Sequence, residues 1–89
     1  MHYFMYILKS KIVDRFYIGQ TSNLKKRIKR HNSGEMFSTK PYCPWKIIYF
    51  ETFLTRSDAM KREHFLKSPA GWNELQNIKQ QNNSNDISF

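Results

Sequence analysis

The chain has 89 residues, a net charge of +8 and a single cysteine, Cys43. A chain of this length forms one domain and buries only about 60% of the surface that its unfolded form exposes. One cysteine excludes an internal disulfide, and no spacing of cysteine and histidine indicates a zinc site. No apolar run approaches the roughly 20 residues of a membrane span, and the N-terminus lacks a signal-peptide pattern. We therefore expect a cytoplasmic protein with no membrane contact.

The positive charge is unevenly distributed. Residues 1–45 carry nine lysines and arginines against two acids, whereas residues 46–89 carry six against five. The charge is concentrated around Lys25–Arg30. A basic domain attracts polyanions, which makes nucleic acid a candidate partner. A well-solvated helix face would produce the same pattern, so composition alone does not decide between the two.

The predicted elements follow from apolar patterning and from turn and cap residues. In chain order they are a strand at 2–9, a strand at 15–20, a helix at 24–32, a loop at 35–44, a strand at 45–53, a helix at 57–67 and a helix at 72–80. Residues 81–89 form a polar segment of low complexity that we expect to be disordered. The order β-β-α-β-α-α and the short first connection favour a three-stranded antiparallel sheet flanked by helices, a small α/β (α+β) domain at residues 1–80.

The predicted helix at 24–32 has a charged residue on its inward face. At about 100° per residue, Arg27 and His31 share that face with Leu24 and Ile28. An inward arginine must find hydrogen-bonding partners, because an unpaired buried charge is costly. The other basic residues of this helix point outward and are candidates for contact with a phosphate backbone: Lys25, Lys26, Lys29 and Arg30.

The predicted helix at 57–67 repeats this pattern with the opposite charge. Glu63 lies in the middle of the apolar arc that Ala59 and Leu66 define, and Lys67 follows one turn later. One interpretation is structural, either a buried Arg27–Glu63 salt bridge or side chains that reach past the apolar surface to solvent. The other is a polar cleft, in which the carboxylate holds a hard cation and the guanidinium a phosphate.

Two tyrosines complete a pattern that resembles the GIY-YIG nuclease family. The segments Met5-Tyr6-Ile7 and Tyr17-Ile18-Gly19 resemble the two halves of its motif, and the second tyrosine follows eleven positions after the first. Arg27 follows ten residues after the second tyrosine, and His31 four residues later. Ala59–Glu63 resembles the later helix that carries the family's metal-binding glutamate. The resemblance covers residues 3–68 and is closest to the small single-domain bacterial members.

The resemblance implies a role for each matching residue. Tyr17, or else Tyr6, would act as general base for the attacking water, and the other tyrosine would orient water or phosphate. Arg27 would stabilise charge on the phosphate, and His31 would assist proton transfer or contact the phosphate. Glu63 would bind one Mg²⁺ or Mn²⁺ ion. Independently of the resemblance, Lys67 and the outward basic residues of the first helix are candidates for contact with nucleic acid.

The chain departs from the family pattern in a few places. Met5 replaces the first glycine of the motif, and Gln20 stands where the excision-repair members have a basic residue. Neither Asn73 nor Asn77 has the spacing of the family's downstream asparagine. The resemblance still implies a metal-dependent endonuclease, acting on DNA in preference to RNA. Its specificity would come from substrate shape, a partner protein or a homodimer. A catalytically silent nucleic-acid-binding module is the alternative, and a basic protein-interaction domain is a third possibility.

Overall fold

The central strand of the sheet is apolar on both faces, as its sequence predicts. The computed structural model describes residues 1–88 and places β1 (Tyr3–Ser10) between two neighbours. The neighbours are β2 (Phe16–Thr21) and β3 (Trp45–Phe53), and both pair with β1 in the antiparallel sense, in the order β2-β1-β3. The predicted three-stranded antiparallel sheet is therefore confirmed. The observed strands begin and end within a residue or two of the predicted bounds.

Three helices cover the sheet, and capping residues define where two of them begin. They are α1 (Leu24–Asn32), α2 (Arg56–Lys67) and α3 (Trp72–Asn82). The side chain of Asn23 accepts a hydrogen bond from the backbone N–H of Lys26, and that of Thr55 accepts one from Asp58. These bonds satisfy backbone donors that a helix start leaves without a partner. Short 3-10 turns at Lys40–Tyr42 and Pro69–Gly71 complete the α+β fold.

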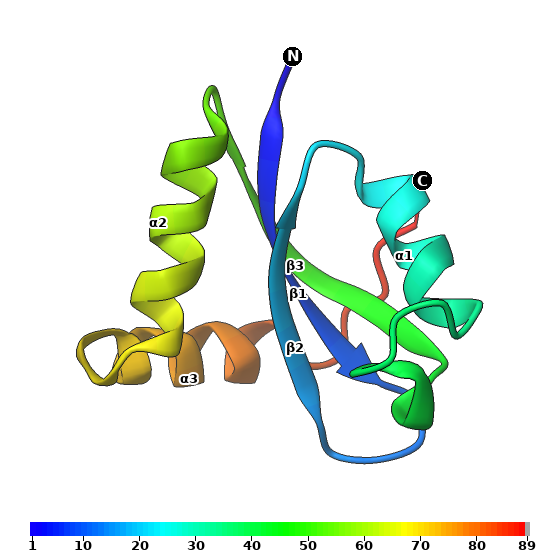
Figure 1. Cartoon of the computed structure of the whole chain (residues 1–89). Coiled ribbons are helices and arrows are strands. Elements are labelled where there is room, and N and C mark those ends of the chain that lie inside the picture. The colour runs from blue at the N-terminus through cyan, green and yellow to red at the C-terminus, as the bar shows by residue number, and fades with distance from the viewer. Residues whose placement is uncertain (89) are drawn as a thin grey trace.

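The sheet separates two apolar cores. Figure 1 shows α1 on one side of the sheet and α2 and α3 on the other. A register shift beside Ile7 and Leu8 on β1 places two successive β3 residues, Ile48 and Tyr49, on the same face. The core under α2 and α3 includes Met5, Ile7, Ile18, Ile48, Leu66, Leu75 and Ile78. The core under α1 includes Tyr6, Leu8, Leu24, Trp45 and Ile47.

The C-terminal segment differs from the expected disordered tail. Helix α3 continues to Asn82, and the backbone N–H of Ile87 donates to the carbonyl of Ile47 at 2.8 Å. The Asn85 side chain also donates to the carbonyl of Ile48 at 3.2 Å. Asn85 and Ile87 are thus joined to the edge of β3 by polar bonds, which the apolar content of the segment does not reveal. Phe89 lies outside the described residues.

Helix α3 begins at the predicted position, Trp72, but this residue is 59% exposed and is not part of the core. Gly71, immediately before it, is buried against the backbone of Phe65, which turns the chain closely past the end of α2. Leu75 and Ile78 supply the apolar face of α3 instead. Among residues 1–88, no helix combines the length and apolar content that crossing a bilayer requires.

Candidate active site

The two tyrosines of the motif lie on the sheet face that α1 covers. In the antiparallel register Tyr6 of β1 is opposite Gly19 of β2, and Leu8 is opposite Tyr17. The two tyrosine rings are therefore diagonal neighbours, with their centroids 6.2 Å apart. A Cβ atom at Gly19 would lie 2.6 Å from the Tyr6 hydroxyl oxygen and 2.9 Å from the ring of Tyr17. Glycine at this position leaves the room that the Tyr6 hydroxyl occupies.

His31 reaches the same face from the last turn of α1 and is fully buried. Its Nε2 lies 3.0 Å from the Tyr6 hydroxyl, and its Nδ1 lies 2.9 Å from Thr39 Oγ1. The Thr39 hydroxyl donates its proton to the carbonyl of Met36 at 3.3 Å, so its oxygen accepts from Nδ1–H. This arrangement leaves Nε2 as the acceptor, and the Tyr6 hydroxyl donates to it.

Both members of this pair are neutral. Burial, reinforced by the neighbouring Tyr17, raises the pKa of Tyr6 well above its usual value of 10, although the Arg27 guanidinium opposes the shift. Burial, together with the charges of Arg27 and Arg30, lowers the pKa of His31 to about 4. At neutral pH the tyrosine keeps its proton beside an unprotonated imidazole.

Glu63 and Lys67 approach the tyrosines from α2. The Glu63 side chain is only 16% exposed, and its Oε2 lies 2.7 Å from Lys67 Nζ. Lys67 Nζ also lies 5.8 Å from the centre of the Tyr17 ring, while the Glu63 charge contributes to the raised pKa of Tyr6. An Arg27–Glu63 salt bridge, one of the interpretations of the sequence, is not found among residues 1–88, where Lys67 is the ion-pair partner of this carboxylate. The charges of Arg27 and Glu63 both affect the pKa of Tyr6, which Arg27 lowers and Glu63 raises.

The predicted basic residues of α1 line several hollows, and Lys29 shares one of them with Lys26 and Arg30. Lys26 and Arg30 line a hollow beside Arg27, together with the residues that lead into the helix. Lys25 and Lys29 line a different hollow, which lies against Trp45 and the C-terminal segment. The hollow of Lys26 and Arg30 includes Arg27, whose charge affects the pKa of both Tyr6 and His31. Lys25 and Lys29 line the hollow at the β3 edge of the sheet.

A further charged cluster on α2 lies outside this site, and the sequence pattern did not reveal it. Arg62 binds both carboxylate oxygens of Glu51 on β3, at 2.8 and 3.0 Å, and also contacts Glu74 on α3. The Tyr49 hydroxyl donates to Glu51 at 2.5 Å. Arg62 and Glu51 are each about one fifth exposed, and they tie α2 to the sheet and to α3. The charges of this cluster therefore have a structural explanation. Glu63, the residue after Arg62, has no such contact with the sheet or with α3 within the described residues 1–88.

The donor set near the tyrosines suits one hard cation. Residues 1–88 contain no group of three or more metal-ligating side chains. Glu63 pairs with Lys67, and its charge raises the pKa of Tyr6. Mg²⁺ commonly binds proteins through one or two carboxylates and keeps several waters, with substrate phosphate completing its shell. A single glutamate is compatible with that mode of binding, and it would have to exchange its contact with Lys67 for the ion.

This combination of fold and residues defines a class of protein. The model of the GIY-YIG catalytic domain matches residues 2–84, and the chain belongs to the GIY-YIG family, a family of nucleases. The chain is 37% identical over 92 residues to UPF0213 protein CPE1444 of Clostridium perfringens, covering 97% of this chain and 98% of that protein. It is 33% identical over 89 residues to UPF0213 protein YazA of Bacillus subtilis, covering 99% of this chain and 89% of the relative.

A solved structure supports the same assignment. The solution NMR structure of UPF0213 protein BH0048 from Bacillus halodurans matches with a TM-score of 0.55 and 26% sequence identity. The match covers 94% of this chain and 89% of that one. The resemblance inferred from Tyr6, Tyr17, Arg27 and Glu63 is therefore confirmed at the level of family and fold. The names of these relatives specify no substrate, metal or mechanism.

Proposed function

We propose that this protein is an endonuclease that hydrolyses phosphodiester bonds in DNA with the help of one divalent cation. The observation that carries the proposal is the hydrogen bond from the Tyr6 hydroxyl to the buried, neutral His31, within a nuclease-family domain. The charges of Arg27 and Glu63, which lie on the helices on either side of the sheet, affect the pKa of that same hydroxyl. The neutral His31 can accept a proton through Tyr6, the Arg27 guanidinium is positively charged, and Glu63 supplies a carboxylate. Together these groups suit the hydrolysis of an anionic phosphodiester.

The pair gives a path for the proton of the attacking water. As the water oxygen bonds to phosphorus, its proton passes to the Tyr6 oxygen while the Tyr6 proton passes to His31 Nε2. The P–O bond to the leaving oxygen breaks, and that oxygen takes a proton from solvent. An anionic phosphate beside the pair raises the pKa of His31 from about 4, because it stabilises the imidazolium. The pair therefore becomes a stronger base when substrate is bound.

The charged residues have separate tasks in this scheme. Arg27 stabilises the charge that develops on the phosphoryl oxygens, as a fixed guanidinium can do without reorganisation. Glu63 would hold one Mg²⁺ or Mn²⁺, which when bound polarises the phosphoryl oxygen and assists the leaving group. Lys67 balances the Glu63 charge at rest, and its position over Tyr17 allows it to contact substrate phosphate. Lys26 and Arg30 extend the positive surface beside Arg27.

A cleavage assay tests this function. Duplex, single-stranded, flapped and branched DNA, and RNA, are incubated with Mg²⁺ or Mn²⁺, alongside EDTA and Glu63→Ala controls. We expect cleavage of DNA that both controls abolish. The Glu63→Ala protein should still bind DNA and should melt close to the wild-type temperature, since this carboxylate has only Lys67 as an ion-pair partner among residues 1–88.

The same assay distinguishes the alternative of a silent binding module. If no substrate is cut at any metal concentration while the protein still shifts DNA in a gel, the catalytic proposal fails. Binding must then fall steeply with rising salt concentration, because contacts with phosphate release counterions. If the protein binds no nucleic acid at low salt either, the binding module is excluded as well.

A further inference from the structure

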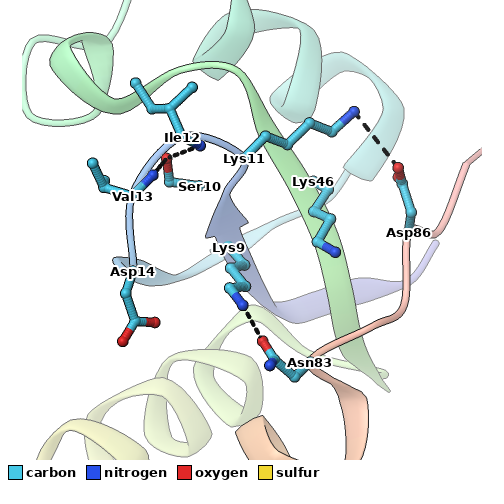
Figure 2. A pocket seen from close by; sticks show the side chains of 9 residues that line it. All are labelled: Lys9, Ser10, Lys11, Ile12, Val13, Asp14, Lys46, Asn83 and Asp86. Carbon is cyan, nitrogen blue, oxygen red and sulfur yellow. Dashed lines mark hydrogen bonds and ion pairs between the residues drawn. The ribbon is translucent and has the colours of Figure 1, made fainter.

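A hollow lies at the end of the sheet where β1 turns into β2. Figure 2 shows the ammonium groups of Lys9, Lys11 and Lys46 around it, with Asn83 and Asp86 of the C-terminal segment on the opposite rim. Lys9 contacts the Asn83 side-chain oxygen, and Lys11 Nζ lies 3.6 Å from Asp86 Oδ2. The site residues Tyr6, His31 and Glu63 take no part in it.

Two of these lysines are placed in an unfavourable arrangement. Lys9 on β1 and Lys46 on β3 are direct partners in the antiparallel register, so they project from the same face of the sheet. Like charges directly opposite one another destabilise a sheet. No carboxylate among residues 1–88 forms an ion pair with either lysine. An anion in the hollow would relieve this repulsion.

The same positive surface continues to α1. A second hollow shares Lys11, Lys46 and Asp86 with the first and adds Lys25 and Lys29 from α1. The two hollows together form one path, which runs from the outer side of α1 around the β3 edge towards the end of α3. We call its five cations the β3-edge lysines: Lys9, Lys11, Lys25, Lys29 and Lys46.

Acidic side chains neutralise little of this path. Asp86 is the carboxylate that both hollows share, and Asp14 lies on the hairpin rim of the first. The Lys11–Asp86 pair is about half exposed on both sides and spans 3.6 Å, so it contributes little to stability and can be exchanged for another anion. The path therefore keeps a net positive charge along its length.

We propose that the β3-edge lysines bind the phosphate backbone of a second strand or arm of the nucleic-acid substrate. This strand or arm extends from the active site over α1 to the β3 edge. The inference rests on the proposed nuclease function and names its substrate class, a flapped or branched DNA. Tyr6 faces α1, whereas Lys9 and Lys46 lie on the face covered by α3. A backbone that contacts both must turn around the β3 edge, which a flap or branch does more easily than a straight duplex.

Binding measured in EDTA tests this proposal without requiring cleavage. Fluorescence anisotropy compares a flapped duplex with the same duplex lacking its flap, over a series of salt concentrations. The test variant is Lys46→Gln, and the matched control is Lys61→Gln, which removes one charge from an exposed position of α2 outside both hollows. Asp86→Asn removes a negative charge from both hollows, so its expected effect on binding is opposite to that of Lys46→Gln.

We expect Lys46→Gln to weaken binding of the flapped duplex about three- to tenfold more than Lys61→Gln does, and to reduce the salt slope by about 1. On the duplex without a flap the two variants should have equal effects. Asp86→Asn should tighten binding of the flapped duplex. Equal effects of Lys46→Gln and Lys61→Gln on both substrates would overturn the proposal, as would unchanged or weaker binding by Asp86→Asn.

Three outcomes separate this proposal from the binding of a small anion and from the proposed nuclease function. If Lys46→Gln weakens binding of inorganic phosphate, followed by NMR, but not of the flapped duplex, the lysines bind a small anion and the proposal fails. If the protein cuts no DNA but shows the expected flap-dependent binding, the nuclease function fails and the second binding path stands. If it cuts DNA and the two lysine variants are indistinguishable, only the path fails.

Discussion

The Tyr6 hydroxyl and the Nε2 of His31 lie 3.0 Å apart, although 25 residues separate them along the chain. The contact joins the central strand to the last turn of α1. Because Thr39 accepts the Nδ1 proton, the imidazole presents its unprotonated nitrogen to the tyrosine. The general base that we propose is therefore a pair of residues held by three elements, and each contact in the pair can be removed separately.

Removing the hydroxyl at each tyrosine in turn distinguishes their roles. Tyr6→Phe removes the donor to His31, and we expect cleavage to fall by about 10²- to 10⁴-fold, the usual contribution of general base catalysis. Tyr17→Phe keeps the Tyr6–His31 pair and should reduce cleavage less. Single-turnover cleavage rates measure both effects, with melting curves to establish that each variant is folded. A larger loss with Tyr17→Phe would make Tyr17 the base.

Gly19→Ala tests the close approach of β2 to the tyrosine. The added methyl group would lie 2.6 Å from the Tyr6 hydroxyl oxygen, closer than unbonded atoms allow, so the ring must move away from His31. We expect a loss of cleavage comparable to that of Tyr6→Phe, together with a lower melting temperature. Alanine normally stabilises a strand relative to glycine, so the direction of the change is itself informative. Full cleavage by this variant would contradict the proposed position of the hydroxyl.

The sequence was sufficient to predict the fold and most of the residues that gather at the site. Periodicity placed Arg27 and His31 on the inward face of α1 and Glu63 among the apolar residues of α2, and the family resemblance supplied their chemistry. The helix at 24–32 has the predicted bounds because its cap and its stop are both local signals. Strand pairing followed from the order of elements and the short first connection.

The contacts of the loop and the C-terminal segment could not be predicted in this way. Thr39 is one of several small polar residues in an irregular loop, and only the folded backbone brings it to His31. The attachment of Ile87 to Ile47 spans 40 residues and depends on backbone groups that every residue has. Neither contact leaves a periodic pattern of residue types, so sequence reasoning has nothing from which to infer it.

Thr39 is a positioning residue, and two substitutions separate its hydroxyl from its bulk. Thr39→Val keeps the shape but leaves the buried Nδ1–H of His31 without an acceptor, at a cost of about 1–3 kcal/mol. We expect lower stability, slower cleavage and an altered pH profile, because the imidazole is no longer restricted to one tautomer. Thr39→Ser retains the oxygen and should restore the profile. If serine and valine behave alike, the hydroxyl does not position His31.

The bridge between Arg62 and Glu51 should matter for stability and not for cleavage. Arg62→Met leaves the mostly buried Glu51 carboxylate without its cation, and we expect a loss on the order of 1–2 kcal/mol, since solvent reaches part of the pair. Urea denaturation measures this loss. Cleavage at a temperature where the variant is folded should match the wild type, in contrast to Glu63→Ala one residue later. A large loss of cleavage would place Arg62 in the site.

His31 should make folding stability depend on pH in a defined range. Its pKa is about 4 in the folded protein, against the ordinary value of 6.5, because burial disfavours the imidazolium. The unfolded chain therefore binds more protons between these values, so stability rises with pH through that range. The contribution is fully present above pH 6.5 and is lost as the pH falls towards 4; its size is on the order of 3 kcal/mol. For Glu51, burial favours a higher pKa, but the hydrogen bonds from Arg62 and Tyr49 outweigh burial and hold the pKa below its usual value. Glu51 therefore contributes a loss of folding stability only at the acid end of the range.

Urea denaturation at a series of pH values between 4 and 7 measures this dependence, and His31→Gln is the matched variant because glutamine does not titrate. We expect the wild type to lose stability steeply across the range and His31→Gln to lose much less, whatever its stability at pH 7. Parallel curves for the two proteins would mean that folding does not shift the pKa of His31. That outcome would exclude the proposed pH effect and contradict the burial of His31 as a neutral imidazole beside Tyr6.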